Sequence, residues 1–332
     1  MAVYTHLGAE DLADLIGHYD VGRLVSAKGI AEGVSNSNWL IETSGTRAGG
    51  ESRADEKSSR FILTMYERRI DVSELPFFLG LLDHLAENGC PVPRTIHDRS
   101  GQNVRAVDGK SVALIEYLPG VSVDRPVPQQ ALNVGKALAQ VHLAAGSYAE
   151  NRAQSLGLEE WGRIVRACGE TGLAQIDPSL PEICAEELAY LSQNWPQALP
   201  SGVVHCDLFP DNVLMLGDTV SGLIDFYFAA TDFFAYDLAV THAAWCFSGD
   251  DGAFRPDIAS ALVAGYQSIR TLSKAEVDAF PILARGAAMR FIASRADDWL
   301  NTPQDALVSR KDPMDFVKRL KFYRKAGPST FA

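Results

Sequence analysis

Apolar and polar residues change their pattern partway along this chain. Up to residue 117 the apolar positions fall mainly in short runs with polar punctuation, which is typical of strands. Two amphipathic stretches, 9–19 and 73–88, have the spacing of helices. After the connector Leu118–Gly120 the pattern is mostly helical, apart from short apolar strands between residues 202 and 226. The strands expected before the connector are 23–31, 38–43, 61–67, 103–107 and 111–117.

The helix expected over 73–88 has clear end signals. Ser73 is suited to cap its start, Pro76 falls in the first turn, and Gly89 follows the last residue. In contrast, residues 44–60 are polar and rich in Gly and Ser, so we expect an exposed loop there. The apolar residues that share one face of the helix are Leu75, Phe78, Leu79, Leu82 and Leu85.

The order of these elements predicts two domains. A β-β-β-α-β-β series fills residues 1–117, and a mostly helical part carrying the polar motifs fills 118–332. We therefore predict an α+β fold with a small antiparallel-sheet domain and a larger helical one. A length of 332 residues is enough for two parts with cores of their own.

Composition and charge argue against several classes of protein. The chain is 47% hydrophobic and 22% charged, which is ordinary for a globular protein. Its net charge of −12 argues against nucleic acid or an anionic membrane as the main partner. No apolar run approaches the ~20 residues of a membrane span, and the start MAVYTHLGAE lacks the pattern of a signal peptide. Scattered cysteines without a Cys-x-x-Cys pair fit a reducing cytoplasm.

Two short motifs carry the candidate chemistry, VVHCDLFPDNVL at 203–214 and GLIDF at 222–226. Phosphoryl transfer from ATP needs a carboxylate that orients the acceptor hydroxyl, and Asp207 is suited to that role. The Mg²⁺ ions that hold the nucleotide phosphates need hard oxygen ligands, which Asn212 and Asp225 can supply. The spacing matches a kinase catalytic loop, His-x-Asp with an Asn five residues after the Asp.

A purely structural role is the alternative, since Asp and Asn favour turns by bonding their own backbone. It accounts for the polar turn at 207–212. It does not account for Asp225, which we expect inside an apolar strand, where a charge is costly unless paired or metal-bound. Cys206 invites a nucleophile role, but a small buried filler is the simpler interpretation. For His142, in an apolar helix, we expect a core histidine.

The motifs together resemble the aminoglycoside-phosphotransferase-like family of small-molecule kinases. The shared segments, in family order, are GVSNSNWLI, EYLPG, LAQVHLA, VVHCDLFPDNVL, LIDF and YDLA. Within this group the chain is most similar to the type II homoserine kinases, on KGIAEGVSNSNWLI, FILTMYERR, ELPFFLGLLDHLAENGCPVP and RFIASRADDW. The resemblance spans nearly the whole chain. It implies a protein-kinase-like bilobal fold with nucleotide between the lobes and adenine near residues 116–118.

The resemblance also implies roles for single residues. Asp207 is similar to the catalytic base, and Asn212 and Asp225 to the Mg²⁺ ligands. His205 and Asp237 resemble residues that brace the catalytic loop, although an ordinary helix-start Asp is an equal alternative for Asp237. The residues implied in ATP binding are Gly33, Ser35, Asn36, Asn38, Glu116, Leu118 and Leu214.

One position departs from the kinase pattern. The third strand of a kinase carries a Lys that grips the α- and β-phosphates, and here Thr64 stands at that position. A hydroxyl cannot supply the missing charge. The positive charge can come instead from Lys28, Arg68 or Arg69. The helical Glu that pairs with this Lys in a kinase has two candidates here, Glu74 and Glu87.

An acid and a base are candidates for the acceptor site. Asp232 lies in the aromatic run 225–237 and is a candidate ligand for a substrate ammonium, with a solvated place at the edge of the core as an equal alternative. Arg290 recurs with Arg285 and Arg295 at helical spacing, and an Arg can bind a carboxylate with two hydrogen bonds. A solvated helix face paired with Asp297 and Asp298 is the alternative for at least two of these arginines.

The implied function is ATP- and Mg²⁺-dependent phosphorylation of L-homoserine to O-phospho-L-homoserine, a step of threonine biosynthesis. The first alternative is another alcohol kinase of the same fold, acting on choline, methylthioribose or an aminoglycoside. A nucleotide-binding pseudokinase is the second, motivated by Thr64. Choline requires an aromatic cage without an Arg partner, whereas homoserine requires an acid and a base together.

Overall fold

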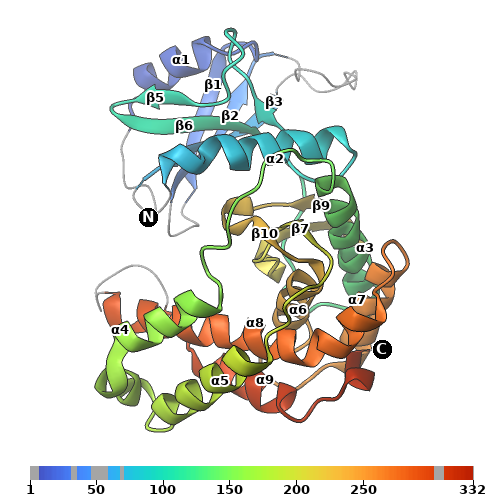
Figure 1. Cartoon of the computed structure of the whole chain (residues 1–332). Coiled ribbons are helices and arrows are strands. Elements are labelled where there is room, and N and C mark those ends of the chain that lie inside the picture. The colour runs from blue at the N-terminus through green and yellow to red at the C-terminus, as the bar shows by residue number, and fades with distance from the viewer. Residues whose placement is uncertain (1–6, 31–35, 46–58, 68–70, 303–309, 332) are drawn as a thin grey trace. The chain divides into compact units, whose positions relative to one another are not determined.

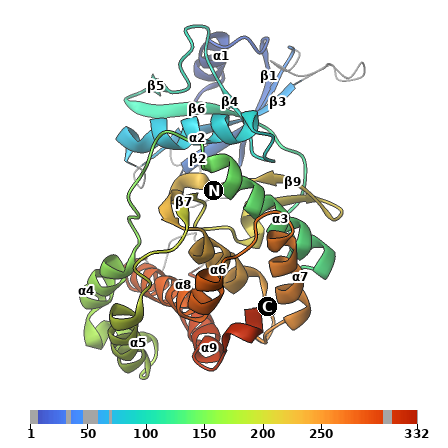
Figure 2. The same ribbon diagram turned by 45° about the vertical axis from the view of Figure 1, so that its right-hand side comes forward.

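The structure is a computed structural model that describes residues 7–30, 36–45, 59–67, 71–302 and 310–331. The chain divides into two compact units, Met1–Pro119 and Gly120–Ala332. Figures 1 and 2 show a sheet with helices in the first unit and mostly helices in the second. The expected α+β class, an antiparallel sheet followed by a mostly helical part, is confirmed.

An antiparallel sheet forms the first unit, in the strand order β1-β2-β3-β6-β4, with β5 paired to β6. In the pairing of β2 with β3, Trp39 lies opposite Leu63 and Ile41 lies opposite Phe61. Because side chains alternate along a strand, these four share one face, and they form one buried cluster with apolar residues of α1 (Ala9–Gly17). The strands are Leu24–Ile30 (β1), Asn36–Thr43 (β2), Ser59–Tyr66 (β3), Thr95–Ile96 (β4), Arg105–Val107 (β5) and Lys110–Glu116 (β6).

Helix α2 (Leu75–Glu87) lies on the other side of the sheet from α1 (Figures 1 and 2). It begins differently from our expectation, because a 3₁₀ turn, η1 (Val72–Glu74), precedes it and contains Ser73. The carboxylate of Asp71 accepts a hydrogen bond of 2.9 Å from the backbone N–H of Ser73. Asp71 therefore caps this helical segment, and the prediction for Ser73 was wrong. Gly89 follows the helix with a φ of +78°, a conformation that favours glycine.

Seven helices, four short strands and three 3₁₀ turns are described in the second unit. Strand β7 pairs with β10, and β8 pairs with β9 in a hairpin. The helices are Pro128–Ala145 (α3), Leu158–Ile176 (α4), Leu180–Asn194 (α5), Phe234–Trp245 (α6), Pro256–Gln267 (α7), Lys274–Asn301 (α8) and Met314–Tyr323 (α9). The other elements are Ser201–Val204 (β7), Val213–Leu216 (β8), Thr219–Leu223 (β9), Ala230–Phe233 (β10), Pro210–Asn212 (η2), Phe226–Phe228 (η3) and Pro328–Phe331 (η4).

Helix α6 lies at the core of this unit. Its residues from Ala235 to Trp245 are all buried, as expected for a helix that is apolar on nearly every side. The long helix α8 packs against α6, α4 and α9. It starts with a capping box, in which the hydroxyl of Ser273 and the carboxylate of Glu276 each bond the backbone N–H of the other residue.

Two glycines set the distance between α3 and α7. A Cβ atom on Gly135 would lie 2.1 Å from the carbonyl oxygen of Leu262, and one on Gly265 would lie 2.0 Å from that of Leu132. The two helices therefore approach each other backbone to backbone, which larger residues at these positions would prevent. This close approach brings residues at the C-terminal ends of α3 and α7 within side-chain reach of each other.

Candidate active site

The loop between β7 and β8, residues 205–212, is called the catalytic loop below. It leaves β7 at His205 and passes through Cys206, which is fully buried and has a φ of +61°. This left-handed conformation is unusual for a residue with a Cβ atom. Asp207 follows with its side chain 18% exposed. The buried position of Cys206 raises the pKa of its thiol well above the ordinary value, so it is an inert filler of the turn rather than a nucleophile.

Asp207 is held from two sides. The amide nitrogen of Asn212 donates to its carbonyl oxygen at 2.8 Å and lies 3.4 Å from its carboxylate Oδ2. The guanidinium of Arg290 lies 3.8 Å from its Oδ1. Burial raises the pKa of Asp207, while the charge of Arg290 opposes this rise. The arrangement presents one carboxylate, partly open to solvent, in a defined orientation.

Asp225 joins this site through the backbone. The N–H of Ile224 donates to the carbonyl of Asn212 at 3.0 Å, and the carbonyl of Ile224 accepts from His205 Nε2 at 3.0 Å. Asp225 then adopts a φ of +66°. It lies after β9 and before η3, so our expectation that it lies within a strand was wrong. The hairpin of β8 and β9 returns the chain to the catalytic loop at this point.

Negative charge gathers around Asp225. Surrounding protein raises the pKa of its carboxyl group to about 7, and the charges of Asp207 and Asp211 add to the rise. Asp225 is in contact with solvent, and solvent screening weakens the repulsion between its carboxylate and the two neighbouring ones. Carboxylates that repel one another in this way are stabilised by a cation.

Within the described ranges, no group of three or more His, Cys, Asp or Glu side chains has the arrangement of a metal site. This does not conflict with Mg²⁺, which commonly takes one or two carboxylates, keeps several waters and binds substrate phosphates. The donor set of Asn212 and Asp225, with the raised pKa of Asp225, fits such an ion. Their role as metal ligands stays a prediction.

Asp237, in the first turn of α6, receives the start of the catalytic loop. Its carboxylate accepts from the backbone N–H of His205 at 2.8 Å and from that of Cys206 at 2.7 Å. Burial by itself would raise the pKa of Asp237, but hydrogen bonds from His142 and His205 hold it below the ordinary value. Asp237 therefore does more than begin a helix, because it fixes two successive N–H groups of the loop.

His205 also has a structural position. Its Nδ1 accepts from the N–H of Asp207 at 3.2 Å, and its Nε2 donates to the carbonyl of Ile224 at 3.0 Å. Burial lowers its pKa, so the neutral ring is favoured. The ring thus joins the residue before Asp225 to the catalytic loop and leaves no nitrogen for proton transfer.

Arg290 is placed differently from the expectation. Its side chain is 2% exposed and donates to the carbonyl oxygen of Cys206, so we assign it to holding the loop rather than to a substrate carboxylate. Arg285 pairs with the buried Glu187 at 2.6 Å, and Arg295 donates to the carbonyl of Asp312 at 3.0 Å. The side chains of Arg285 and Arg295 are only 13% exposed, so the prediction that they lie on a solvated helix face was wrong.

Asp232, on β10, lies beside the catalytic loop. Its Oδ2 accepts from the amide of Gln154 at 3.0 Å, and the same amide donates to the sulfur of Cys206 at 3.3 Å. Its Oδ1 accepts from the N–H of Phe233 at 2.7 Å. Burial raises the pKa of Asp232, so the carboxylate is fixed in place where a cation would stabilise it.

The residues expected to bind ATP are only partly described. Gly33 and Ser35 lie outside the described residues, whereas Asn36 and Asn38 lie on β2. Glu116 ends β6 and its carboxylate accepts from the N–H of Arg94 at 3.2 Å. Leu118 is half-buried. The nucleotide roles of all these residues, and of Leu214 on β8, stay predictions.

Thr64 lies on β3 and donates its hydroxyl proton to the Oδ1 of Asn38 at 2.9 Å. Lys28 lies on β1 and is exposed. Arg68 and Arg69 are outside the described residues. Of the two candidate acids, Glu74 ends η1 and Glu87 ends α2. The structure therefore does not select a substitute for the missing Lys.

Sequence reasoning missed Gln154 and the wider role of His142. Gln154 precedes α4, far in sequence from the motif, and no pattern marks it. His142 is buried, as expected for a core histidine, but its Nε2 bonds the Oδ2 of Asp237 at 2.9 Å. The only signal in the sequence was a single His within an apolar, Ala-rich stretch, LAQVHLA, which indicates a buried hydrogen bond at this position.

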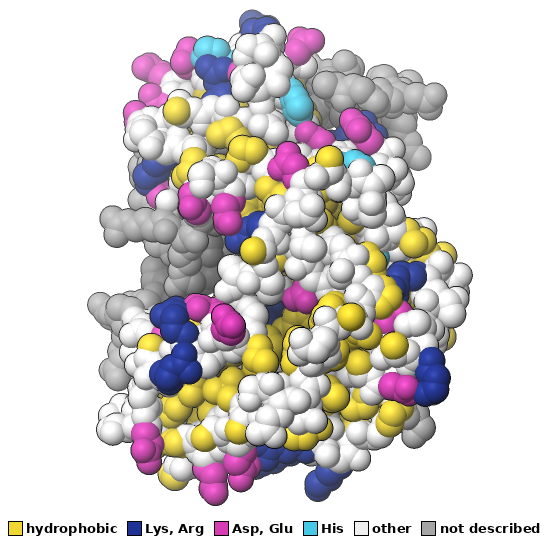
Figure 3. Space-filling model, viewed as in Figure 1, with side chains coloured by type: hydrophobic (Ala, Val, Ile, Leu, Met, Phe, Trp, Pro, Cys, Tyr) yellow, Lys and Arg dark blue, Asp and Glu magenta, His cyan; other side chains and the backbone are white. Residues whose placement is uncertain are grey.

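On the face shown in Figure 3, acidic and basic side chains are scattered among one another and do not gather into a basic patch. None of the described helices is both long and apolar enough to span a bilayer.

Comparisons with known proteins agree with this geometry. Residues 26–272 match the model of the phosphotransferase enzyme family. A homoserine kinase of Azorhizobium caulinodans is 47% identical over 98% of this chain and 96% of its own length. A homoserine kinase of Xanthobacter autotrophicus is 46% identical, again over 98% and 96%.

Solved structures share the fold at low sequence identity. An amicoumacin kinase, solved with AMP-PNP and Ca²⁺, has a TM-score of 0.68 at 15% identity, covering 97% of this chain and 95% of its own. A spectinomycin phosphotransferase, solved with ADP and spectinomycin, has a TM-score of 0.66 at 14% identity, covering 96% and 95%. The chain therefore belongs to the phosphotransferase enzyme family, as a small-molecule kinase homologous to the homoserine kinases.

Proposed function

We propose that this enzyme transfers the γ-phosphoryl group of ATP to the side-chain hydroxyl of L-homoserine, giving O-phospho-L-homoserine and ADP. The main support is the full-length similarity to homoserine kinases, joined to a site with one oriented carboxylate, Asp207, beside Asn212 and Asp225. Threonine is made from O-phospho-L-homoserine, so we place the enzyme in threonine biosynthesis.

In the proposed reaction Asp207 accepts a hydrogen bond from the acceptor hydroxyl and takes its proton as the new O–P bond forms. The bond between the γ-phosphorus and the β,γ-bridging oxygen breaks, and ADP leaves with that electron pair. Asn212 and Asp225 are the residues that would hold Mg²⁺, which supplies positive charge across the phosphates when bound. Catalysis then rests on positioning and charge neutralisation, with no covalent intermediate on the enzyme.

Asp232 is the residue that we assign to the α-ammonium of homoserine. Its carboxylate is oriented by Gln154 and the N–H of Phe233, and it lies on the strand that pairs with β7, directly before the catalytic loop. A substrate cation would relieve the cost that burial imposes on this carboxylate. No described residue is assigned to the α-carboxylate, because Arg290 is buried and bonded to the loop.

A panel of acceptors tests the proposal. We expect L-homoserine to have a higher kcat/KM than L-serine, choline, methylthioribose or an aminoglycoside. The hydroxyl of L-serine is one methylene shorter, and a misplacement of ~1 Å can cost about 10²-fold. Faster turnover of choline or of a sugar would remove the acceptor assignment and leave the kinase assignment standing.

The ammonium subsite has its own test in 4-hydroxybutyrate, which is homoserine without the amino group. Wild-type enzyme should prefer L-homoserine strongly, and Asp232→Asn should reduce that preference mainly by raising the KM for L-homoserine. Asp211→Asn is the matched control, since Asp211 is exposed and pairs with Lys311 at 3.5 Å. An unchanged preference in Asp232→Asn would place the ammonium elsewhere.

A further inference from the structure

We infer that Tyr266 is a positioning residue for phosphoryl transfer, acting through His142 and Asp237 on the backbone of the catalytic loop. Tyr266 makes no hydrogen bond to Asp207 in the described part of the chain, and it does not belong to the motif that carries the chemistry. The inference rests on the proposed function only in the choice of L-homoserine as the acceptor for its assay.

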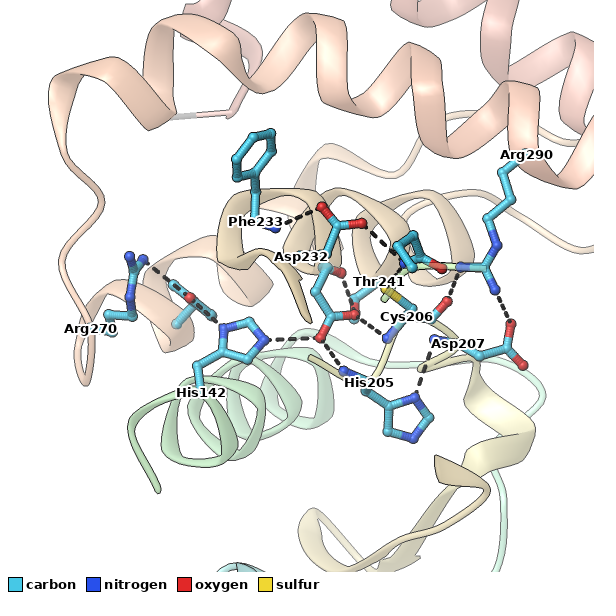
Figure 4. A network of polar contacts seen from close by, with 12 residues as sticks. His142, His205, Cys206, Asp207, Asp232, Phe233, Thr241, Arg270 and Arg290 are labelled. Atoms are coloured by element: carbon cyan, nitrogen blue, oxygen red, sulfur yellow. Dashed lines mark hydrogen bonds and ion pairs between the residues drawn. The ribbon is translucent and has the colours of Figure 1, made fainter. Parts of the chain in front are cut away.

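A continuous chain of hydrogen bonds, buried from Tyr266 to the catalytic loop, carries the inference (Figure 4). Arg270 lies after α7 and donates from Nη1 to the hydroxyl of Tyr266 at 3.2 Å. This hydroxyl bonds His142 Nδ1 at 2.7 Å, and His142 Nε2 bonds the Oδ2 of Asp237 at 2.9 Å. The carboxylate of Asp237 then accepts from the two backbone N–H groups that begin the loop. We call this series the relay.

The protons in the relay have one consistent order. Asp237 is an acceptor for two backbone N–H groups and stays ionised, so His142 Nε2 must donate to it. In the neutral ring, His142 Nδ1 is then an acceptor and takes the proton of Tyr266. The hydroxyl oxygen of Tyr266 is left to accept from Arg270. Each donor therefore points towards Asp237, from a guanidinium at one end to a carboxylate at the other.

The far end of the relay is anchored to α8. A second nitrogen of Arg270 donates to the Oε1 of Glu276 at 2.8 Å. The Oε2 of Glu276 accepts from the N–H and hydroxyl of Ser273 at 2.8 and 2.9 Å, as part of the cap of α8. The guanidinium also lies 4.7 Å from the ring centre of Phe234, at the start of α6. The position of Tyr266 is thus set by α7, α8 and α6 together.

The catalytic loop has a reason to need this support. Cys206 holds a left-handed backbone conformation, with a φ of +61°, that residues with a Cβ atom rarely adopt. Such strain persists only where the surroundings over-determine it. Asp237 bonds the N–H of Cys206, and Arg290 bonds its carbonyl oxygen. A carboxylate free to rotate would hold the turn less firmly, and Asp207 is the next residue.

The same unit contains a matched control for the relay. His242 and Tyr323 form a second fully buried pair, with the hydroxyl of Tyr323 bonded to His242 Nδ1 at 2.8 Å. In this pair, however, the other ring nitrogen of His242 has no hydrogen-bond partner in the described part of the chain. Removing the hydroxyl of Tyr323 therefore costs a buried hydrogen bond without touching the catalytic loop.

The first experiment compares Tyr266→Phe with Tyr323→Phe, using full-length enzyme, Mg·ATP and L-homoserine. Both variants should lower Tm by a few degrees, Tyr266→Phe by more, since it loses the hydrogen bonds to His142 and Arg270 whereas Tyr323→Phe loses one. Tyr266→Phe should also lower kcat about 10-fold, as loss of an outer partner of a functional group does, with the KM of ATP and of L-homoserine little changed. Tyr323→Phe should keep its kcat within about 2-fold of wild type. Equal kcat in the two variants would overturn the inference.

A second pair of variants separates hydrogen bonding from packing. Gln at position 142 can donate to Asp237 and accept from Tyr266, whereas Leu can do neither. We expect His142→Gln to keep most of kcat and His142→Leu to lose it. The double variant His142→Leu/Tyr266→Phe should lose no more kcat than His142→Leu alone, because the hydroxyl acts through the ring. Additive losses would show that Tyr266 acts by another route.

Hydrogen exchange gives a readout that does not depend on activity. Amides of residues 203–208 should exchange faster in Tyr266→Phe than in wild type, and Tyr323→Phe should match wild type there. If the wild-type enzyme fails to phosphorylate L-homoserine, the proposed function falls. The exchange data, and the same kcat ratios on an alcohol that it does phosphorylate, still decide the relay. Unchanged exchange at 203–208 would count against it.

Discussion

Asp207 is the residue on which the proposed chemistry depends most directly. Asn212 and Arg290 hold it from two sides, so its carboxylate is oriented before any acceptor arrives. An isosteric amide at this position keeps the shape and loses the base. Removal of the whole side chain would in addition leave the buried charge of Arg290 without this carboxylate as its neighbour.

We therefore predict that Asp207→Asn lowers kcat by about 10² to 10⁴-fold, the usual contribution of a general base. The KM of ATP should change little. Steady-state kinetics against Asp211→Asn, whose side chain is 64% exposed in the same loop, provides the comparison. Near-wild-type kcat in Asp207→Asn would exclude it as the base.

His242 predicts how stability depends on pH. Burial lowers its pKa from 6.5 to about 3, so between these values the unfolded chain binds a proton that the folded protein does not. The contribution of His242 to the free energy of unfolding is therefore fully present above about pH 6.5. It falls as the pH drops through this window, by up to about 1.4 kcal/mol per pH unit from one such group. Buried His205, whose pKa is also lowered, acts in the same direction.

The test is urea unfolding of wild type and His242→Asn at pH 7 and pH 5. Asn can still accept from Tyr323 but cannot titrate. We expect the variant to be less stable at pH 7 and to lose less stability on going to pH 5. Parallel losses in the two proteins would show that His242 is not responsible.

At the scale of the elements, the contact of α3 with α7 is the tightest constraint. Gly135 faces the carbonyl of Leu262 and Gly265 faces that of Leu132, each without room for a Cβ atom. A backbone atom cannot move aside as the end of a side chain can. The relay residues His142 and Tyr266 lie on these two helices, so the glycines also set the distance between them.

We predict that Gly135→Ala destabilises the protein by about 1–3 kcal/mol, the usual cost of overpacking. Gly162 in α4 is the control, because the nearest atom to its Cβ would be the mobile guanidinium of Arg166 at 3.1 Å. Gly162→Ala should be neutral or stabilising, since Ala favours a helix by up to ~1 kcal/mol over Gly. Thermal unfolding measures both, and equal Tm values would refute the packing argument.

At the scale of the whole molecule, ligand binding should raise the free energy of unfolding. A ligand at 100 times its Kd raises the free energy of unfolding by about 2.7 kcal/mol. We expect Mg·ATP to raise Tm by several degrees, and EDTA to remove most of this gain, since Asn212 and Asp225 are proposed to act through the metal.

Asp225→Asn should fold like wild type but lose the Mg²⁺-dependent part of the ATP shift, measured by calorimetry. Asp218→Asn should keep it, because Asp218 is exposed in the turn between β8 and β9. A full Mg²⁺-dependent shift in Asp225→Asn would mean that other groups hold the metal.

Local pattern was a good guide to the elements and to the chemical motif. The helix before Gly89 and most strands of the first unit were predictable, because period and end signals are properties of neighbouring residues. The Ser73 cap was wrong, since Asp71 accepts from both the N–H and the hydroxyl of Ser73 and caps the 3₁₀ turn that precedes α2. The two-residue strand β4 was missed because it is too short to show alternation.

The sequence by itself determined the class of fold, the family and the candidate set of Asp207, Asn212 and Asp225, because motif spacing is a one-dimensional property. Only the tertiary structure decided what Arg290 does, since burial against the carbonyl of Cys206 depends on where α8 packs. It also brought His142 and Tyr266 together from positions 124 residues apart. Partners so distant meet only through helix packing, which no local pattern of residues records.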